Sequence, residues 1–157
     1  MNFFLLNVLL AIAWAALNGE FSPEYLVAGF ILGYAILWTF YRALGSDNYL
    51  TRVPRVIHFF FYFLWELFQA NVRVLVEVIT PRLQAKPAIV AVPLDITDDT
   101  QITLLVQLLT LTPGSLPIDI SSDRRVLYIH MMYVDDLEAA RQSVKQGFEK
   151  QIMELFR

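Results

Sequence analysis

Five polar side chains recur on one side of an otherwise apolar stretch between residues 54 and 80. At about 100° per residue, with Glu66 as zero, Arg73 falls at about 340° and Glu77 at about 20° of a helix. The polar stripe consists of His58, Glu66, Gln69, Arg73 and Glu77. Inside a membrane, carboxylates can carry protons or cations, and a neighbouring histidine or arginine tunes their pKa. The stripe is therefore a candidate site of intramembrane ion chemistry.

Three interpretations of the polar stripe remain open. In the first, it borders an ion path in an assembly, with Glu66 and Glu77 as acidic carriers. In the second, Arg73 and Glu77, four residues apart, form a structural ion pair packed against another subunit. In the third, the second half of the helix leaves the bilayer and its stripe faces water. Charge within a membrane segment is costly, so one of these environments must surround the stripe.

The rest of the chain carries no catalytic constellation. It contains no cysteine, which excludes disulfides, thiol catalysis and thiolate metal sites. His130 has no second histidine near it in the sequence, which is more typical of a structural histidine than of a metal ligand. Asp95, Asp98 and Asp99 could suggest a cation site, but helix capping explains them more simply. Neither of the common glycine-rich phosphate loops occurs. We therefore expect no enzyme, no metal and no cofactor.

The composition is that of a membrane protein. Of 157 residues, 57% are hydrophobic and 17% are charged, which is too apolar for an ordinary soluble domain of this length. Most of the charges lie after residue 80, so we expect lipid around the first half and water around the second. The net charge is -3, and no basic cluster is longer than Arg124-Arg125. This charge pattern excludes nucleic acid as a partner.

Three short membrane helices are predicted, at about residues 3–17, 24–44 and 54–80. The first is uncharged, but at ~1.5 Å per residue it spans only ~23 Å of a ~30 Å hydrocarbon core. A cleaved signal peptide is the alternative for this segment. It is disfavoured because a basic start is missing and a second apolar segment follows at once.

Glycine and proline place the second and third helices. Ser22 and Pro23 are typical of a helix start, and Pro54 indicates the start of the third helix in the same way. Gly29 and Gly33, four residues apart in the second helix, would let another helix approach its backbone closely.

The sequence leaves more than one orientation of these helices in the membrane open. The linker after the second helix carries Arg42, Arg52 and Arg55, whereas the turn at residues 18–23 has no basic residue. This bias places the linker in the cytoplasm. A third helix that crosses fully would then put the following domain outside, whereas a short or interfacial third helix would keep linker and domain on one side. Alternatively, the first two helices form a half-deep hairpin on the outer side, covered by partner protein.

Residues 81–157 are predicted to form a small α+β domain of the order β-α-β-β-α. Short apolar or alternating runs at 88–92, 116–120 and 126–133 predict strands, and the last two form an antiparallel hairpin. Asp98 is expected to cap a helix that ends at residue 111, and Asp135 is expected to cap the last helix. One face of that last helix packs on the sheet.

The helix ending at residue 111 runs into Thr110-Leu111-Thr112-Pro113-Gly114-Ser115. Its threonine hydroxyls can bond to free carbonyls, the proline stops the helix, and the glycine permits the positive φ of a tight return. The turn motif consists of Thr110, Thr112, Pro113, Gly114 and Ser115. A structural role is sufficient, and docking against a neighbouring subunit is the sharper alternative, because loops often carry interfaces.

The turn motif also resembles a known signature. It is similar to the TLTPGT sequence of the E subunit of the Mrp-type (Mnh) multisubunit Na+/H+ antiporters, with Ser115 in place of threonine. Other similar stretches follow the family's order, at Asn18-Gly19, Pro54, Ala70-Asn71-Val72 and Leu127-Tyr128-Ile129-His130. The resemblance therefore covers essentially the whole chain.

The resemblance implies an accessory subunit of a multisubunit monovalent cation/proton (Na+/H+) antiporter in the bacterial inner membrane. Such a subunit supports assembly and activity, has the other antiporter subunits as partners, and carries its C-terminal domain in the cytoplasm. No residue is implied as an ion ligand. The alternative is a membrane-anchored adaptor whose soluble domain recruits a cytoplasmic partner.

Overall fold

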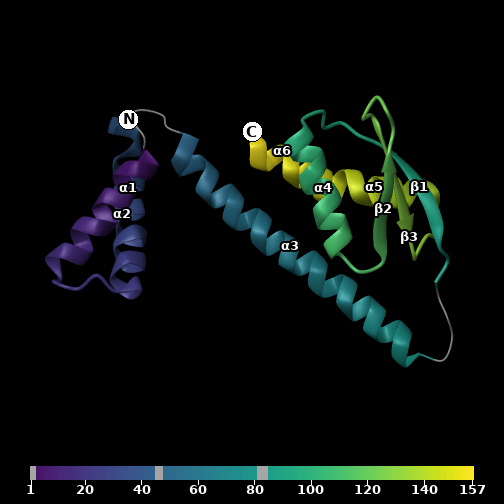
Figure 1. Ribbon diagram of the computed structural model, residues 1–157, viewed down its shortest axis with the longest axis horizontal. Helices are drawn as coiled ribbons and strands as arrows, with labels where there is room; N and C mark the ends of the chain where they lie inside the picture. Colours follow the sequence, from purple (N-terminus) through teal and green to yellow (C-terminus); the bar gives the residue numbers. More distant parts are fainter. Residues whose placement is uncertain (1–2, 45–47, 81–84) are drawn as a thin grey trace. The chain divides into compact units, whose positions relative to one another are not determined.

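The computed structural model describes residues 3–44, 48–80 and 85–157. Two compact units result, Met1–Val56 and Ile57–Arg157. The first contains α1 (Phe3–Leu17), α2 (Pro23–Leu44) and the start of α3 (Asn48–Ile79), as labelled in Figure 1. The second contains the rest of α3, β1 (Ala88–Pro93), α4 (Asp99–Leu111), β2 (Ser115–Ile120), β3 (Val126–Met131), α5 (Leu137–Val144), η1 (Lys145–Glu149) and α6 (Lys150–Phe156). Residues 45–47, within the expected linker between the second and third helices, and residues 81–84, at the start of the expected domain, lie outside the described residues.

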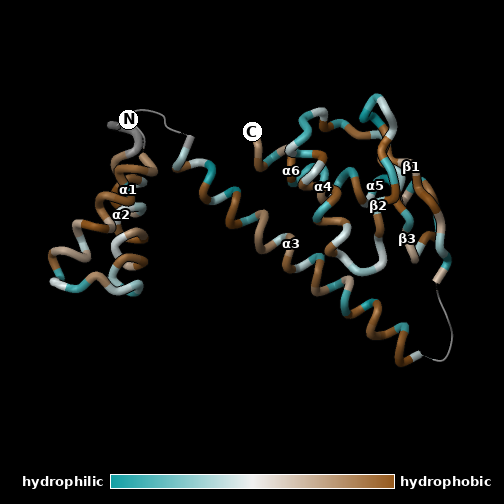
Figure 2. The backbone as a smooth tube through the Cα atoms, in the orientation of Figure 1, coloured by the Kyte–Doolittle hydropathy of each residue, from teal (hydrophilic) through white to brown (hydrophobic). Residues whose placement is uncertain are grey.

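Two described helices are long and apolar enough to cross a membrane, with suitable stretches at Pro23–Phe40 and Tyr49–Ile79. The apolar helix α1 is shorter. Hydrophobic residues dominate α1 and α2, whereas α3 alternates between hydrophobic and hydrophilic along its length (Figure 2). A mostly helical membrane part with a small sheet domain is thus confirmed, while the count of three membrane helices and the boundary at residue 80 stay predictions.

The two glycines of α2 are used within this chain. A Cβ atom on Gly29 would lie 2.7 Å from the Trp14 Cβ and 2.9 Å from the Ala11 carbonyl oxygen, both on α1. A Cβ atom on Gly33 would collide with the Asn7 side chain. Because neither glycine has a side chain, α1 packs directly on the backbone of α2. The close approach expected from this spacing is therefore between the first two helices.

The third helix begins earlier than predicted. It starts at Asn48, so Pro54 lies inside the helix and not at its start. Proline has no N–H to donate to the carbonyl four residues earlier, which here belongs to Leu50. The Tyr34 hydroxyl of α2 donates to that carbonyl at 3.1 Å. This contact between helices supplies the donor that the proline lacks, which explains why Pro54 does not mark the helix start.

The predicted β-α-β-β-α order is confirmed, with an antiparallel sheet of strand order β1-β3-β2. Asp98 caps α4 as expected, because its carboxylate accepts hydrogen bonds from two backbone N–H groups of the first turn. The cap of α5 is Asp136 and not Asp135. The extended backbone of Asp136 turns its carboxylate toward the helix N-terminus, while Asp135 pairs with Lys86 at 2.6 Å.

The core of this domain lies between one face of the sheet and the helices α4, α5 and α6. Val90 and Val92 of β1 and Leu127 and Ile129 of β3 are each at most 1% exposed. Their alternation follows the period of two that strands impose. The helices contribute Ile102, Leu105, Leu108, Leu109, Ala140, Val144, Phe148 and Ile152.

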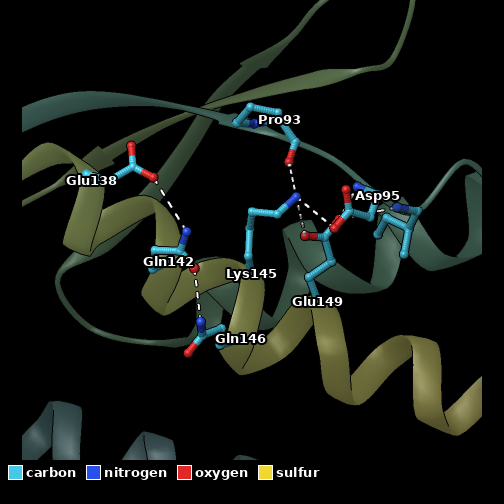
Figure 3. A network of polar contacts seen from close by, with 8 residues as sticks. Pro93, Asp95, Glu138, Gln142, Lys145, Gln146 and Glu149 are labelled. Carbon is cyan, nitrogen blue, oxygen red and sulfur yellow. Dashed lines mark hydrogen bonds and ion pairs between the residues drawn. The ribbon is translucent and has the colours of Figure 1, made fainter.

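A buried carboxylate joins the last helix to the loop between β1 and α4 (Figure 3). Glu149 is 0% exposed, and its Oε1 accepts hydrogen bonds from the N–H groups of Asp95 at 2.6 Å and Ile96 at 3.2 Å. Its Oε2 lies 3.7 Å from the Nζ of Lys145, which also pairs with Asp95 at 2.8 Å. Burial lowers the pKa of Lys145, but the hydrogen bond to Asp95 and the charges of Glu149 and Asp95 outweigh it and leave this pKa raised. The carboxylate thus fixes the loop that leads into α4.

Replacing Glu149 by leucine should destabilise the domain by about 1–3 kcal/mol, because two backbone N–H groups lose their acceptor. Glu149→Gln keeps a carbonyl oxygen and should destabilise it less. Hydrogen exchange of the β1–α4 amides in the detergent-solubilised full chain measures both changes. Glu154→Leu, at an exposed position of the following helix α6, is the matched control and should exchange like the parent. Hydrogen exchange like that of the parent in the Glu149→Leu chain would contradict the role of Glu149 in fixing the β1–α4 loop.

Removing the Tyr34 hydroxyl should loosen the start of α3. We expect Tyr34→Phe to lower stability by roughly 0.6 kcal/mol, the average for hydrogen bonds between membrane helices. Pro54→Ala gives the Leu50 carbonyl an N–H donor, so Tyr34→Phe should have little effect in that background. Thermal unfolding of the four chains in detergent measures this cycle. Equal losses in both backgrounds would show that the hydroxyl does not substitute for the missing amide.

Candidate functional site

The structure brings the polar stripe and the turn motif to one cavity of about 240 Å³. Glu66, Gln69 and Arg73 line it from α3. Four residues of the turn motif, Thr112 to Ser115, line it from the end of α4 and the start of β2. The two sets of residues were identified separately in the sequence, and both belong to the second compact unit. They are therefore parts of one candidate site.

Aromatic side chains hold α3 against the C-terminal domain beside this cavity. The rings of Tyr62 and Phe63 lie with their centroids 5.9 Å and 6.4 Å from that of Phe148 in η1. Phe59 packs against the same core. A Cβ atom on Gly147 would lie 3.2 Å from the Tyr62 hydroxyl, so this glycine leaves room for the tyrosine. Ring contacts at such distances stabilise the pairing beyond the area they bury.

Tyr133, just after β3, is shared by two members of the polar stripe. Its hydroxyl donates a hydrogen bond to the Glu77 carboxylate. The Arg73 guanidinium carbon lies 5.7 Å from the centroid of its ring, within the range of a cation–π contact. The hydrogen bond to Glu77 raises the pKa of Tyr133, because loss of the proton would remove the bond. Within the described residues, Arg73 and Glu77 both contact Tyr133 and form no ion pair with each other.

Two predicted site residues lie away from the cavity. His58 is exposed on α3 and is not part of the cavity lining. Thr110 is also exposed, and its hydroxyl donates to the Val106 carbonyl at 2.8 Å. The candidate site thus contains Glu66, Gln69 and Arg73 of the stripe, with Glu77 attached through its hydrogen bond to Tyr133.

The turn motif closes the C-terminal end of α4. The hydroxyls of Thr112 and Ser115 donate to carbonyl oxygens in the last turn of the helix at 2.7 Å and 2.8 Å. Gly114 has φ of 94°, a conformation that favours glycine. A Cβ atom at this glycine would lie 3.2 Å from the ring of Tyr133. The expected local geometry is confirmed, and the docking role stays a prediction.

Sequence reasoning gave no role in the site to its two tyrosines, Tyr62 and Tyr133. Tyr62 falls at about 320° on the helical wheel that defines the stripe, so its angle was a usable signal. Tyr133 gave no such signal, because its partners lie far away in the sequence and meet it only in the folded chain. In residues 3–44, 48–80 and 85–157, no group of three or more His, Cys, Asp or Glu side chains could hold a metal ion.

Comparison with known sequences gives matches along nearly the whole chain. The family model described as MNHE, Na+/H+ ion antiporter subunit, matches residues 7–155. The Na(+)/H(+) antiporter E subunit of Bacillus subtilis is 42% identical over 153 residues, which are 98% of this chain and 97% of that protein. The Na(+)/H(+) antiporter E subunit of Alkalihalophilus pseudofirmus is 33% identical over 151 residues, 96% of each protein.

Solved structures with a similar fold come from two membrane complexes. A chain of the membrane-bound sulfane sulfur reductase, an archaeal respiratory membrane complex, aligns with TM-score 0.60 and 26% identity over 98% of both chains. A chain of the Mrp complex from Dietzia sp. DQ12-45-1b aligns with TM-score 0.51 and 23% identity over 66% of this chain and 96% of that one, which shows the fold alone. The resemblance found at the turn motif is therefore confirmed over nearly the full length, and the chain belongs to the MNHE family of Na+/H+ ion antiporter subunits.

Proposed function

We propose that this chain is an accessory subunit of a multisubunit monovalent cation/proton antiporter in the bacterial inner membrane, where it supports assembly and activity. The observation that carries the proposal is its 42% identity to the Na(+)/H(+) antiporter E subunit of Bacillus subtilis along 98% of the chain. Its partners are then the other subunits of the antiporter and the lipid around α1, α2 and α3. As its relatives are antiporter subunits, it works as part of a transporter and not as an enzyme in the usual sense.

The geometry of the polar stripe supports a structural role within such a subunit. Arg73 and Glu77 contact Tyr133 of the chain's own C-terminal domain. Glu66 lines the cavity on the same side. Ion paths of secondary transporters form between packed membrane segments, whereas this stripe faces a small sheet domain. We therefore assign the stripe to the attachment of α3, and the ion path to other subunits.

We place the C-terminal domain in the cytoplasm. Arg42, Arg52 and Arg55 flank the linker between α2 and α3, and such basic residues favour the cytoplasmic side. If α1 and α2 cross as a hairpin, the chain start and the linker share that side.

A membrane-anchored adaptor is the second candidate, and the outer face of the sheet favours it. Ile89 of β1 and Leu116 of β2 both align with His130 of β3 on this face. They are 62% and 55% exposed. Exposed apolar side chains on a regular surface are typical of protein contacts, so this face could receive a cytoplasmic protein.

Purification through a tag on this chain from native membranes tests the proposal. A stable set of hydrophobic membrane proteins is the result expected for an antiporter subunit. A soluble cytoplasmic protein as the main companion would support the adaptor, and recovery of the chain alone would contradict both functions.

The chain reconstituted alone should show no Na+/H+ exchange, because one hairpin and one further helix cannot enclose an ion path. Vesicles containing only this chain should release protons in response to sodium no faster than empty vesicles. Exchange above that background would disprove the accessory role. Vesicles with the whole purified complex provide the positive control.

Glu77→Leu and Tyr133→Phe separate attachment from ion transport, since each removes one side of the same hydrogen bond. If the bond attaches α3 to its domain, both changes should reduce the yield of assembled complex alike. The double variant should then lose no more than either single change. Exchange per assembled complex should stay at the parental level. Loss of Na+/H+ exchange in Glu77→Leu, with normal exchange in Tyr133→Phe, would instead assign the carboxylate to an ion path.

A further inference from the structure

The chain's own domain contacts one side of α3 at several points along the helix. Phe59, Tyr62 and Phe63 pack against the domain core, and Glu77 bonds to Tyr133 after β3. At ~1.5 Å per residue, the helix rises about 27 Å between the first and last of these contacts. This length is close to the ~30 Å hydrocarbon thickness of a bilayer.

The opposite side of α3 is apolar and open. Six of the large side chains on this face are between 51% and 64% exposed, namely Ile57, Phe60, Phe61, Trp65, Phe68 and Leu75. They fall at about 120° to 260° from Glu66 on the helical wheel. Between residues 56 and 79, Asn71 is the polar exception on this face. Its side-chain amide donates to the Leu67 carbonyl at 2.7 Å. We call this surface the apolar face of α3.

A crossing α3 would bring its domain into the bilayer. The domain lies beside the helix over most of a membrane thickness, so its surface would sit at hydrocarbon depth. That surface carries exposed ion pairs, Lys86 with Asp135 and Arg124 with Asp99. Charged groups, loops and open sheet edges do not face hydrocarbon without a large penalty. The contacts of the domain therefore conflict with a transmembrane α3, although its length and composition suffice for crossing.

We propose that α3 lies in the plane of the membrane surface, with its apolar face in lipid and the C-terminal domain on its polar side. Continuity with the membrane hairpin supports lipid as the occupant. Three residues join α2 to α3, and Leu50, in the first turn of α3, is buried with Phe3 and Leu37 of that hairpin. A helix with one polar side and an aromatic, aliphatic other side is typical of interfacial helices. The proposal rests on a membrane location and is independent of the accessory role.

Placing α3 along the membrane surface also removes the conflict between the basic linker and the position of the domain. With α1 and α2 as the two crossing segments and α3 along the surface, linker and domain lie on one side without conflict. The basic linker then places both in the cytoplasm.

Spin labels at single cysteines test the proposal in the full chain, which has no cysteine of its own. Phe61→Cys, Phe68→Cys and Leu75→Cys lie seven residues apart on the apolar face. The chain is reconstituted in phosphatidylcholine–phosphatidylglycerol vesicles, and each label is exposed to oxygen and to a water-soluble nickel chelate. An interfacial helix puts all three labels at one shallow depth, about 5–10 Å into the headgroup boundary. A crossing helix changes depth by about 10 Å between successive labels.

Val27→Cys, Ile31→Cys and Trp38→Cys on α2 are the matched controls, because these side chains are similarly exposed and their labels should show a depth gradient. A gradient along α3 like that of α2 would overturn the proposal. The proposal would also be overturned if the nickel chelate reached the α3 labels as freely as it reaches a label at Glu154. Labels shielded from both reagents would overturn it as well, because they would mean that protein covers the apolar face of α3. Val72→Cys and Ile79→Cys, also seven residues apart, repeat the test if a first-series variant does not fold.

Discussion

The charges of α3 need an environment other than hydrocarbon, and the way they are covered determines the arrangement of the second unit. Tyr133 provides a hydroxyl for Glu77 and a ring for Arg73. The rings of Tyr62 and Phe63 contact Phe148 beside them and are partly buried against the domain core. The result is a helix whose polar side is joined to its own domain by these contacts.

The turn motif takes part in this arrangement through a short chain of contacts. Gly114 leaves space for the ring of Tyr133, since a Cβ atom would lie 3.2 Å from it. Its carbonyl oxygen accepts a hydrogen bond from the Met132 N–H at 2.9 Å, which fixes the end of β3 beside the turn. Any side chain at position 114 would press on the tyrosine and also adopt an unfavourable φ. The motif that carries the family resemblance thus positions the tyrosine that covers the charges of α3.

Features that depend on neighbours in the sequence were predictable, and features that depend on distant contacts were not. The cap at Asp98, the hairpin and the alternating core strands follow from local rules, and so does the positive φ of Gly114. The helix start at Asn48 was missed because the donor for the Leu50 carbonyl comes from α2. Asp135 and Asp136 are equally suited to capping by residue type, and contacts from elsewhere decide between them. Glu149 was hidden because η1 is π-helical, which changes the angle between residues and turns a charged side chain into the core.

The contacts of α3 with its own domain, and the proposed contact of its apolar face with lipid, limit where other subunits can bind. Once the polar side of α3 is occupied by the domain, and its apolar face by lipid, α3 offers little free surface to a protein partner. Among the described residues, apolar surface remains on the flanks of the α1–α2 hairpin, lined in part by Val8, Ile12, Val27 and Ile31, and on the outer face of the sheet around Ile89 and Leu116. One of these surfaces belongs to the first compact unit and the other to the second. A subunit built in this way would offer its complex one apolar surface in each of its two units.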